Sequence, residues 1–83
     1  MFPVVIRYWA GAAAAAGVES ETIEAGTVAE ALASAAAGRG PALERVIGIS
    51  SILVDGLRST DQDRDENLAG AVQVEVLPPF AGG

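Results

Sequence analysis

The strongest chemical signal in the sequence is its final segment, which reads Leu77, Pro78, Pro79, Phe80, Ala81, Gly82 and Gly83. A proline has no backbone N–H, so the two prolines end any central strand and stiffen the chain that leaves it. An apolar ring follows, and then the smallest side chains. Because glycine has no Cβ, such an end fits a narrow channel. We therefore expect residues 78–83 to form an extended, flexible tail that presents the terminal carboxylate to another protein's active site.

Little else in the sequence offers chemistry. The chain has no histidine, no cysteine and no lysine, since all five of its cations are arginines. This excludes thiol catalysis, Schiff-base formation and imidazole acid–base chemistry. The acidic stretch DQDRDEN (residues 61–67) has carboxylates at the alternate spacing of a calcium loop, but Leu68 stands where that loop needs glycine and Val74 where it needs glutamate. We interpret it as a solvated acidic loop and predict no metal site.

Composition narrows the class of protein further. With 83 residues and 51% apolar residues the chain has room for one domain with a core. A formal charge of −6 has the wrong sign for binding the phosphates of nucleic acid. No apolar run reaches the roughly 18 residues of a membrane span, and the lack of cysteine fits a reducing compartment. We expect a cytoplasmic protein with neither nucleic acid nor membrane as partner.

The first third of the chain indicates two strands. In PVVIRYWA (residues 3–10) apolar β-formers alternate, with Val4, Ile6 and Tyr8 on one face. The alanine run of residues 11–17, bounded by glycines, predicts a short helix or a turn. Residues 18–25, VESETIEA, carry three glutamates and suit an exposed edge strand.

The main helix is predicted to follow. Thr27 and Glu30 have the spacing of a capping box, apolar residues recur at helical spacing, and Gly38 is expected to end the helix. A second short helix is allowed after the break at Gly40-Pro41. Asp55-Gly56 predicts a type I′ hairpin turn, and AVQVEV (residues 71–76) predicts the last strand. This order favours an α+β fold of the β-grasp type, a mixed sheet with one main helix across it. The domain would span residues 1–77, with the tail at residues 78–83.

Three stretches carry a resemblance to a known family: RYWAG (residues 7–11), LVDG (residues 53–56) and above all VEVLPPFAGG (residues 74–83). Together with the capped helix they resemble the small, sulfur-carrying subunit of molybdopterin synthase, a ubiquitin-like β-grasp family. The likeness spans nearly the whole chain. Its most specific part is the ending, an apolar strand followed by Pro-Pro, one apolar residue, a small residue and Gly-Gly.

The resemblance implies chemistry at the end of the chain. An E1-like enzyme would use ATP to adenylate the carboxylate of Gly83, and a sulfur donor would convert it to a thiocarboxylate. Gly82 and Ala81 would give access, while Phe80, Pro79 and Pro78 would contact the partner. The chain would bind no cofactor and would not be an enzyme by itself. It would join a large subunit, expected as a heterotetramer, that binds the pyranopterin precursor and supplies the catalytic residues.

Other functions stay open within this superfamily. A sulfur carrier for thiamine-thiazole or cysteine synthesis ends in a similar tail, although the thiazole carrier is shorter and lacks the Pro-Pro. A ubiquitin-like modifier, joined through Gly83 to lysines of target proteins, is a different class, as is a pure binding module. On the sheet, outward-facing Arg7, Arg58 and Leu77 are candidates for contact with a partner.

Overall fold

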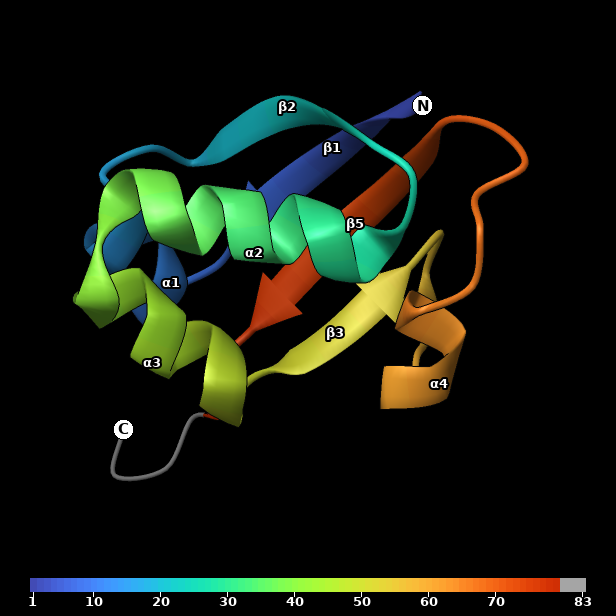
Figure 1. Ribbon diagram of the computed structural model, residues 1–83. Coiled ribbons are helices and arrows are strands. Elements are labelled where there is room, and N and C mark those ends of the chain that lie inside the picture. Colours follow the sequence, from blue (N-terminus) through green and yellow to red (C-terminus); the bar gives the residue numbers. More distant parts are fainter. Residues whose placement is uncertain (80–83) are drawn as a thin grey trace.

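The computed structural model describes residues 1–79. Five strands form one sheet in the order β2-β1-β5-β3-β4 (Figure 1). Their bounds are β1 (Phe2–Tyr8), β2 (Ser20–Ala25), β3 (Ser51–Val54), β4 (Leu57–Arg58) and β5 (Val72–Leu77). β1 pairs antiparallel with β2 and parallel with β5, while β3 pairs antiparallel with β5 and β4. The sheet is mixed, as predicted, and the last strand in the sequence is its central strand.

Helices cover one face of this sheet (Figure 1). Their bounds are α1 (Gly11–Ala16), α2 (Val28–Arg39), α3 (Pro41–Ile49) and α4 (Asp61–Arg64). The Thr27 half of the capping box predicted for the main helix, α2, is confirmed: the Thr27 hydroxyl accepts a hydrogen bond from the Glu30 N–H at 3.0 Å. The Glu30 carboxylate accepts from Gly26 N–H, also at 3.0 Å, rather than from Thr27 N–H as a capping box requires. Within residues 1–79 none of the helices combines the length and apolar character that crossing a membrane demands.

The end of α2 differs from the prediction. The helix does not stop at Gly38 but continues to Arg39, and Gly40 follows with a φ of 107°. The reason is Pro41, which disfavours helical geometry at the residue before it and is itself well suited to the first position of a helix. Gly38 costs α2 about 1 kcal/mol relative to alanine but does not break it.

The core lies between the sheet and the helices. The alternation predicted for β1 and β5 is confirmed, because their inward residues are buried. The fully buried large side chains are Ile6, Leu43, Val4, Val74 and Val76. The facing side of α2 is small, with Ala31 and Ala35 buried, which allows the helix to pack close to the sheet.

The hairpin between β3 and β4 has the predicted turn. Asp55 has a φ of 49° and Gly56 a φ of 83°, both in the left-handed region that a type I′ turn needs. The Asp55 carboxylate also accepts a hydrogen bond from Gln73 N–H at 2.8 Å, which ties the turn to β5.

The acidic segment after the hairpin is not simply a loop. Residues Asp61–Arg64 form the short helix α4, and a capping box that the sequence interpretation overlooks starts it. The Thr60 hydroxyl accepts from Asp63 N–H at 3.1 Å, and the Asp63 carboxylate accepts from Thr60 N–H at 2.9 Å. Arg64 forms an ion pair with Asp61. The expectation of solvent exposure is confirmed, since every carboxylate in residues 61–67 is exposed.

Candidate functional site

The candidate site is the place where the chain leaves the sheet at the end of β5. On one side Val76 aligns with Tyr8 of β1, and on the other Leu77 aligns with Ser51 of β3. The carbonyl of Val76 accepts one more hydrogen bond, from Trp9 N–H at 3.2 Å. β5 then stops, because the next two residues are prolines and donate no ladder hydrogen bonds. The base of the tail is thus fixed from both sides.

Pro78 and Pro79 are the predicted site residues that the structure describes. Pro78 is partly buried at the end of the sheet and Pro79 is exposed, so the chain reaches solvent within two residues of the last ladder pair. The other predicted site residues, Phe80, Ala81, Gly82 and Gly83, lie outside the described residues.

An aromatic group lies beside the base of the tail on the open face of the sheet. The indole N–H of Trp9 donates to the Glu75 carboxylate at 3.0 Å. The Arg7 guanidinium lies over the same indole, with Cζ 4.4 Å from the ring centroid, as in a cation–π contact. Trp9 nevertheless keeps 38% of its surface exposed. A large ring held in one orientation and open to solvent offers contact area to a partner at little entropic cost.

On the inner side a second cluster ties the same end of the sheet to the helices. The Tyr8 hydroxyl donates to Glu21 Oε2 at 2.5 Å, and Arg39 donates to both oxygens of the same carboxylate, Nε at 2.7 Å and Nη2 at 3.1 Å. Arg39 Nη1 also donates to the carbonyl of Ala16 at 2.9 Å. One arginine at the end of α2 therefore links β2 and α1, on the helix-covered side of the sheet and at the end where Tyr8 aligns with Val76.

The protonation states follow from these contacts. Burial and the hydrogen bond to Glu21 raise the pKa of Tyr8 well above its ordinary value. The Arg39 guanidinium lowers the pKa of the Glu21 carboxyl, outweighing its partial burial, and the Tyr8 hydroxyl adds to that effect. Neutral Tyr8 and ionised Glu21 are therefore the forms that the fold favours.

The lowered pKa of Glu21 predicts a pH-dependent stability. A carboxyl whose pKa is lower in the folded state stabilises it above the unfolded pKa, about 4.5, and loses that contribution as the pH falls through the folded pKa. Glu21→Gln should lower the melting temperature by a few degrees at neutral pH, and the difference should vanish in acid. Glu24→Gln, exposed on the same strand, is the matched control. Thermal unfolding over a pH series checks this, and a Glu21→Gln deficit that is equal at every pH would contradict it.

The sequence identifies the surface of this site in part. Arg7 and Arg58 are exposed as expected, and Leu77 is partly buried. Sequence reasoning misses the Tyr8–Glu21–Arg39 cluster and the pairing of Trp9 with Glu75. Alternation along β1 does place Tyr8 inward, which means that its hydroxyl needs a buried partner. Nothing local in the sequence selects Arg39 as part of that cluster.

Comparison with known proteins gives the fold a context. No protein-family model matches the chain, and no curated protein sequence matches it. Among solved structures, the small archaeal modifier protein 1 of Methanosarcina acetivorans superposes with a TM-score of 0.82 at 24% identity, covering 100% of this chain and 98% of that one. Its counterpart from Haloferax volcanii gives a TM-score of 0.76 at 27% identity, covering 98% and 99%.

A third neighbour is a subunit of a molybdopterin-converting factor. A chain in the complex of subunits 1 and 2 of the molybdopterin-converting factor from Helicobacter pylori superposes with a TM-score of 0.69 at 20% identity, covering 98% of this chain and 99% of that one. The predicted resemblance is thereby confirmed: this chain has the ubiquitin-like β-grasp fold, with molybdopterin-converting factor and small archaeal modifier proteins among its structural neighbours.

Proposed function

We propose that this protein is a sulfur carrier for molybdopterin synthesis, in which the carboxylate of Gly83 becomes a thiocarboxylate. The observation that carries the proposal is the continuation of the central strand into the tail. Because Val76 and Leu77 are paired with neighbouring strands, the chain leaves the sheet at a fixed point, which suits delivery of the residues that follow into a partner's active site.

The chemistry is that of an activated acyl group. A carboxylate oxygen of Gly83 attacks the α-phosphorus of ATP on an activating enzyme, and pyrophosphate leaves. A donor whose sulfur is in the oxidation state of hydrosulfide then forms a C–S bond to the carbonyl carbon. The C–O bond to AMP breaks, and AMP leaves with the electron pair. Adenylation is needed because a carboxylate is a poor electrophile and its mixed anhydride carries a good leaving group.

In this proposal the chain supplies sulfur and a partner supplies catalysis. The H. pylori neighbour lies in a complex of two subunits, which supports a large subunit as partner here. Such a partner would take the tail, bind the pyranopterin precursor and carry the catalytic residues. The fixed Trp9 ring beside the tail base is the surface that we expect it to cover.

A ubiquitin-like modifier is the second candidate. It is favoured by the H. volcanii neighbour, a small archaeal modifier protein at 27% identity. In that case Gly83 would be joined to lysines of target proteins by an isopeptide bond. The lack of lysine in this chain means that it would form no isopeptide polymers with itself.

One experiment separates the two candidates. The protein is incubated with its cognate activating enzyme, ATP and sulfide, and its intact mass is measured with fragmentation at the C-terminus. A gain equal to the replacement of one oxygen by sulfur at Gly83 supports the carrier. The thiocarboxylate is then offered to the large subunit with precursor, and loss of that sulfur from Gly83 with its appearance in the precursor completes the test. An unchanged mass, with conjugates to lysines of other proteins instead, would refute the carrier and favour the modifier.

Phe80 is expected to anchor the tail in the partner. Phe80→Ala should weaken binding of the large subunit by at least about tenfold, because a buried aromatic anchor typically contributes more than 1 kcal/mol. Its melting temperature should not change. Phe2→Ala, at the start of β1 and 36% exposed, is the matched control and should bind normally. Calorimetric titration measures both, and equal affinity for the Phe80 variant would rule out the anchor.

A further inference from the structure

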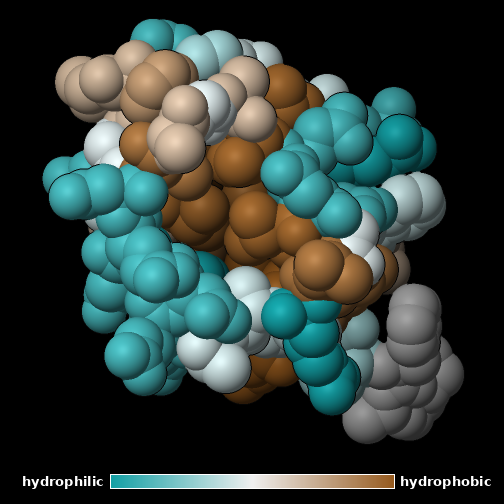
Figure 2. All heavy atoms as spheres, turned by 90° about the vertical axis from the view of Figure 1, so that its right-hand side faces the viewer, coloured by the Kyte–Doolittle hydropathy of each residue, from teal (hydrophilic) through white to brown (hydrophobic). Residues whose placement is uncertain are grey.

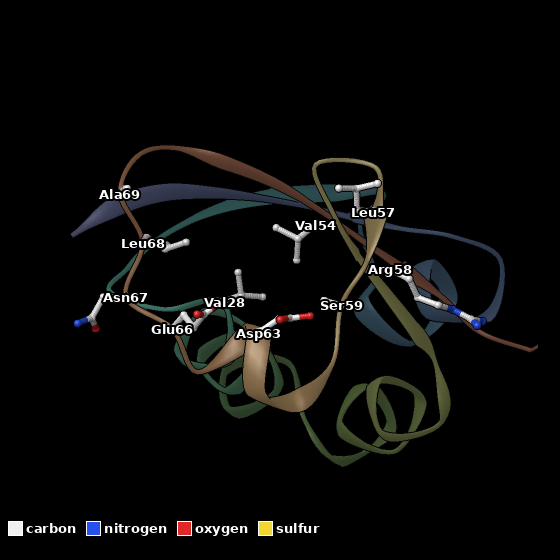
Figure 3. A pocket seen from close by; sticks show the side chains of 10 residues that line it. All are labelled: Val28, Val54, Leu57, Arg58, Ser59, Asp63, Glu66, Asn67, Leu68 and Ala69. Carbon is white, nitrogen blue, oxygen red and sulfur yellow. The ribbon is translucent and has the colours of Figure 1, made fainter.

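A hollow opens at the end of the molecule that carries the β3–β4 hairpin. Figure 2 shows an apolar area there, ringed by hydrophilic side chains. The cavity has a volume of about 320 Å³, and its apolar lining comes from Val28, Val54, Leu57, Leu68 and Ala69. In Figure 3, Val28 of α2, Val54 of β3 and Leu68 point into the same space from three sides. A helix, a strand and the connection before β5 thus leave an apolar space that no side chain among residues 1–79 fills.

Leu57 makes this surface unusual. It follows the hairpin turn and is 74% exposed, next to the partly buried Val54 with which it pairs. A large apolar side chain at the edge of an apolar hollow extends the area that a ligand could cover. The size of the hollow lies at the small end of ligand pockets, which occupy roughly 300–1,000 Å³. It suits one or two apolar side chains of a peptide.

The rim carries negative charge. Residues 61–67 contain four carboxylates and one arginine, a net charge of −3, and the arginine is paired with Asp61. Asp63 and Glu66 of this segment line the hollow directly. Arg58 is the one cation in the lining formed by residues 1–79; it donates to Ser51 Oγ at 3.1 Å, and its side chain points away from the cavity in Figure 3.

This charge decides between possible occupants. A second copy of the chain would bring a net charge of −6 against an acidic rim, so self-association is disfavoured. A segment with arginine or lysine around an apolar side chain would place that side chain against the apolar lining and its cations against the acidic rim. The opposite charges would also speed its association.

We propose that the hollow is a docking site for a basic amphipathic segment of a partner protein. An apolar side chain of that segment enters between Val28, Val54 and Leu68, and its cations face the carboxylates of residues 61–67. The proposal does not depend on the chemistry of the tail.

The position of the hollow gives it a role separate from the tail. Val54 aligns with Val74 near the start of β5, whereas the tail leaves beyond Leu77, which aligns with Ser51. The acidic segment precedes β5 and the tail follows it, and Leu77 lies three residues, or about 10 Å, beyond Val74 along the strand. The hollow and the start of the tail are therefore separate surfaces.

The test selects ligands directly, so the partner need not be identified first. A library of short random peptides is panned on the wild-type protein, and the recovered peptides are titrated against variants. We expect an apolar residue flanked by arginine or lysine, with binding weakened at least about tenfold by Leu57→Asp and by Glu66→Lys and weakened by added salt. Ile49→Asp, which places the same charge at an exposed apolar residue of α3, should leave binding unchanged. Deletion of residues 80–83 should also leave it unchanged.

Several results would overturn the proposal. These are a failure to enrich any peptide, enrichment of peptides without cations, or equal binding to Leu57→Asp. A concentration-dependent dimer that Leu57→Asp abolishes would assign the hollow to a second copy and overturn it as well. If the amide NMR spectrum of Leu57→Asp shows that this variant does not fold, Leu57→Gln replaces it. Glu66→Lys tests the charge independently, because Glu66 is exposed.

Discussion

A protein that lacks Gly83 is expected to form thiocarboxylate more than about a hundredfold more slowly than the wild type, with an unchanged melting temperature. The deletion shortens the tail by one residue, about 3.3–3.6 Å. Reacting atoms must approach to about 3–3.5 Å, and a misplacement of even 1 Å can cost about a hundredfold in rate. The remaining carboxylate, on Gly82, would therefore not reach the activated phosphate. The ladder of β5 ends at Leu77, so the fold does not depend on the deleted residue.

The control for this deletion is a glycine change elsewhere. Gly70→Ala places a Cβ that, apart from Gly70 and its two chain neighbours, has no atom of residues 1–79 within 4 Å, so it should alter neither activation nor stability. Rates are measured from the intact mass over time, with activating enzyme, ATP and sulfide present. Thiocarboxylate formation at the wild-type rate on the shortened chain would disprove a requirement for Gly83.

Leu43→Ala is expected to cause the largest loss of stability. Leu43 is fully buried on α3, the helix that packs against both α1 and α2. Truncation of a buried leucine to alanine costs about 2–5 kcal/mol, because it removes apolar contacts and leaves a cavity. For a domain of this size that corresponds to a drop of at least about 10 °C in melting temperature.

Leu57→Ala supplies the matched comparison. It removes the same atoms from a side chain that is 74% exposed, and surface substitutions of this kind usually change stability by less than about 0.5 kcal/mol. Chemical denaturation of both variants gives the two free energies of unfolding. Similar losses for the two leucines would contradict the burial of Leu43 on α3.

The features that the sequence predicts well are those that local patterns determine. The alternation in β1 and β5 follows from a period of two, and the Asp55-Gly56 turn follows from backbone angles that few residue pairs tolerate. The order of these elements is enough to favour a β-grasp sheet. The end of the last strand before Pro78 belongs to the same group, since proline donates no ladder hydrogen bond. The tail itself stays a prediction, because residues 80–83 lie outside the described residues.

The failures have two physical origins. The loop predicted for residues 61–64 is wrong. The prediction gives more weight to the charge of these residues than to the capping-box spacing of Thr60 and Asp63, which is a local signal for a helix. Gly38 is the wrong helix end, because Pro41 dictates the break a few residues later. The Arg39–Glu21 ion pair and the apolar hollow are different, since both depend on segments that only the folded chain brings together.

The pairing of β1 with β5 also has a mechanical consequence. The two strands are parallel neighbours, so a force that pulls Phe2 and Leu77 apart slides one strand along the other. The ladder between them is then loaded in shear, with its hydrogen bonds sharing the force, rather than opened one bond at a time from an end. Resistance to forced unfolding depends on the rate constant of unfolding, and therefore on how fast this ladder breaks under load. A motor that pulled on the tail would therefore first meet a strand that is paired on both sides.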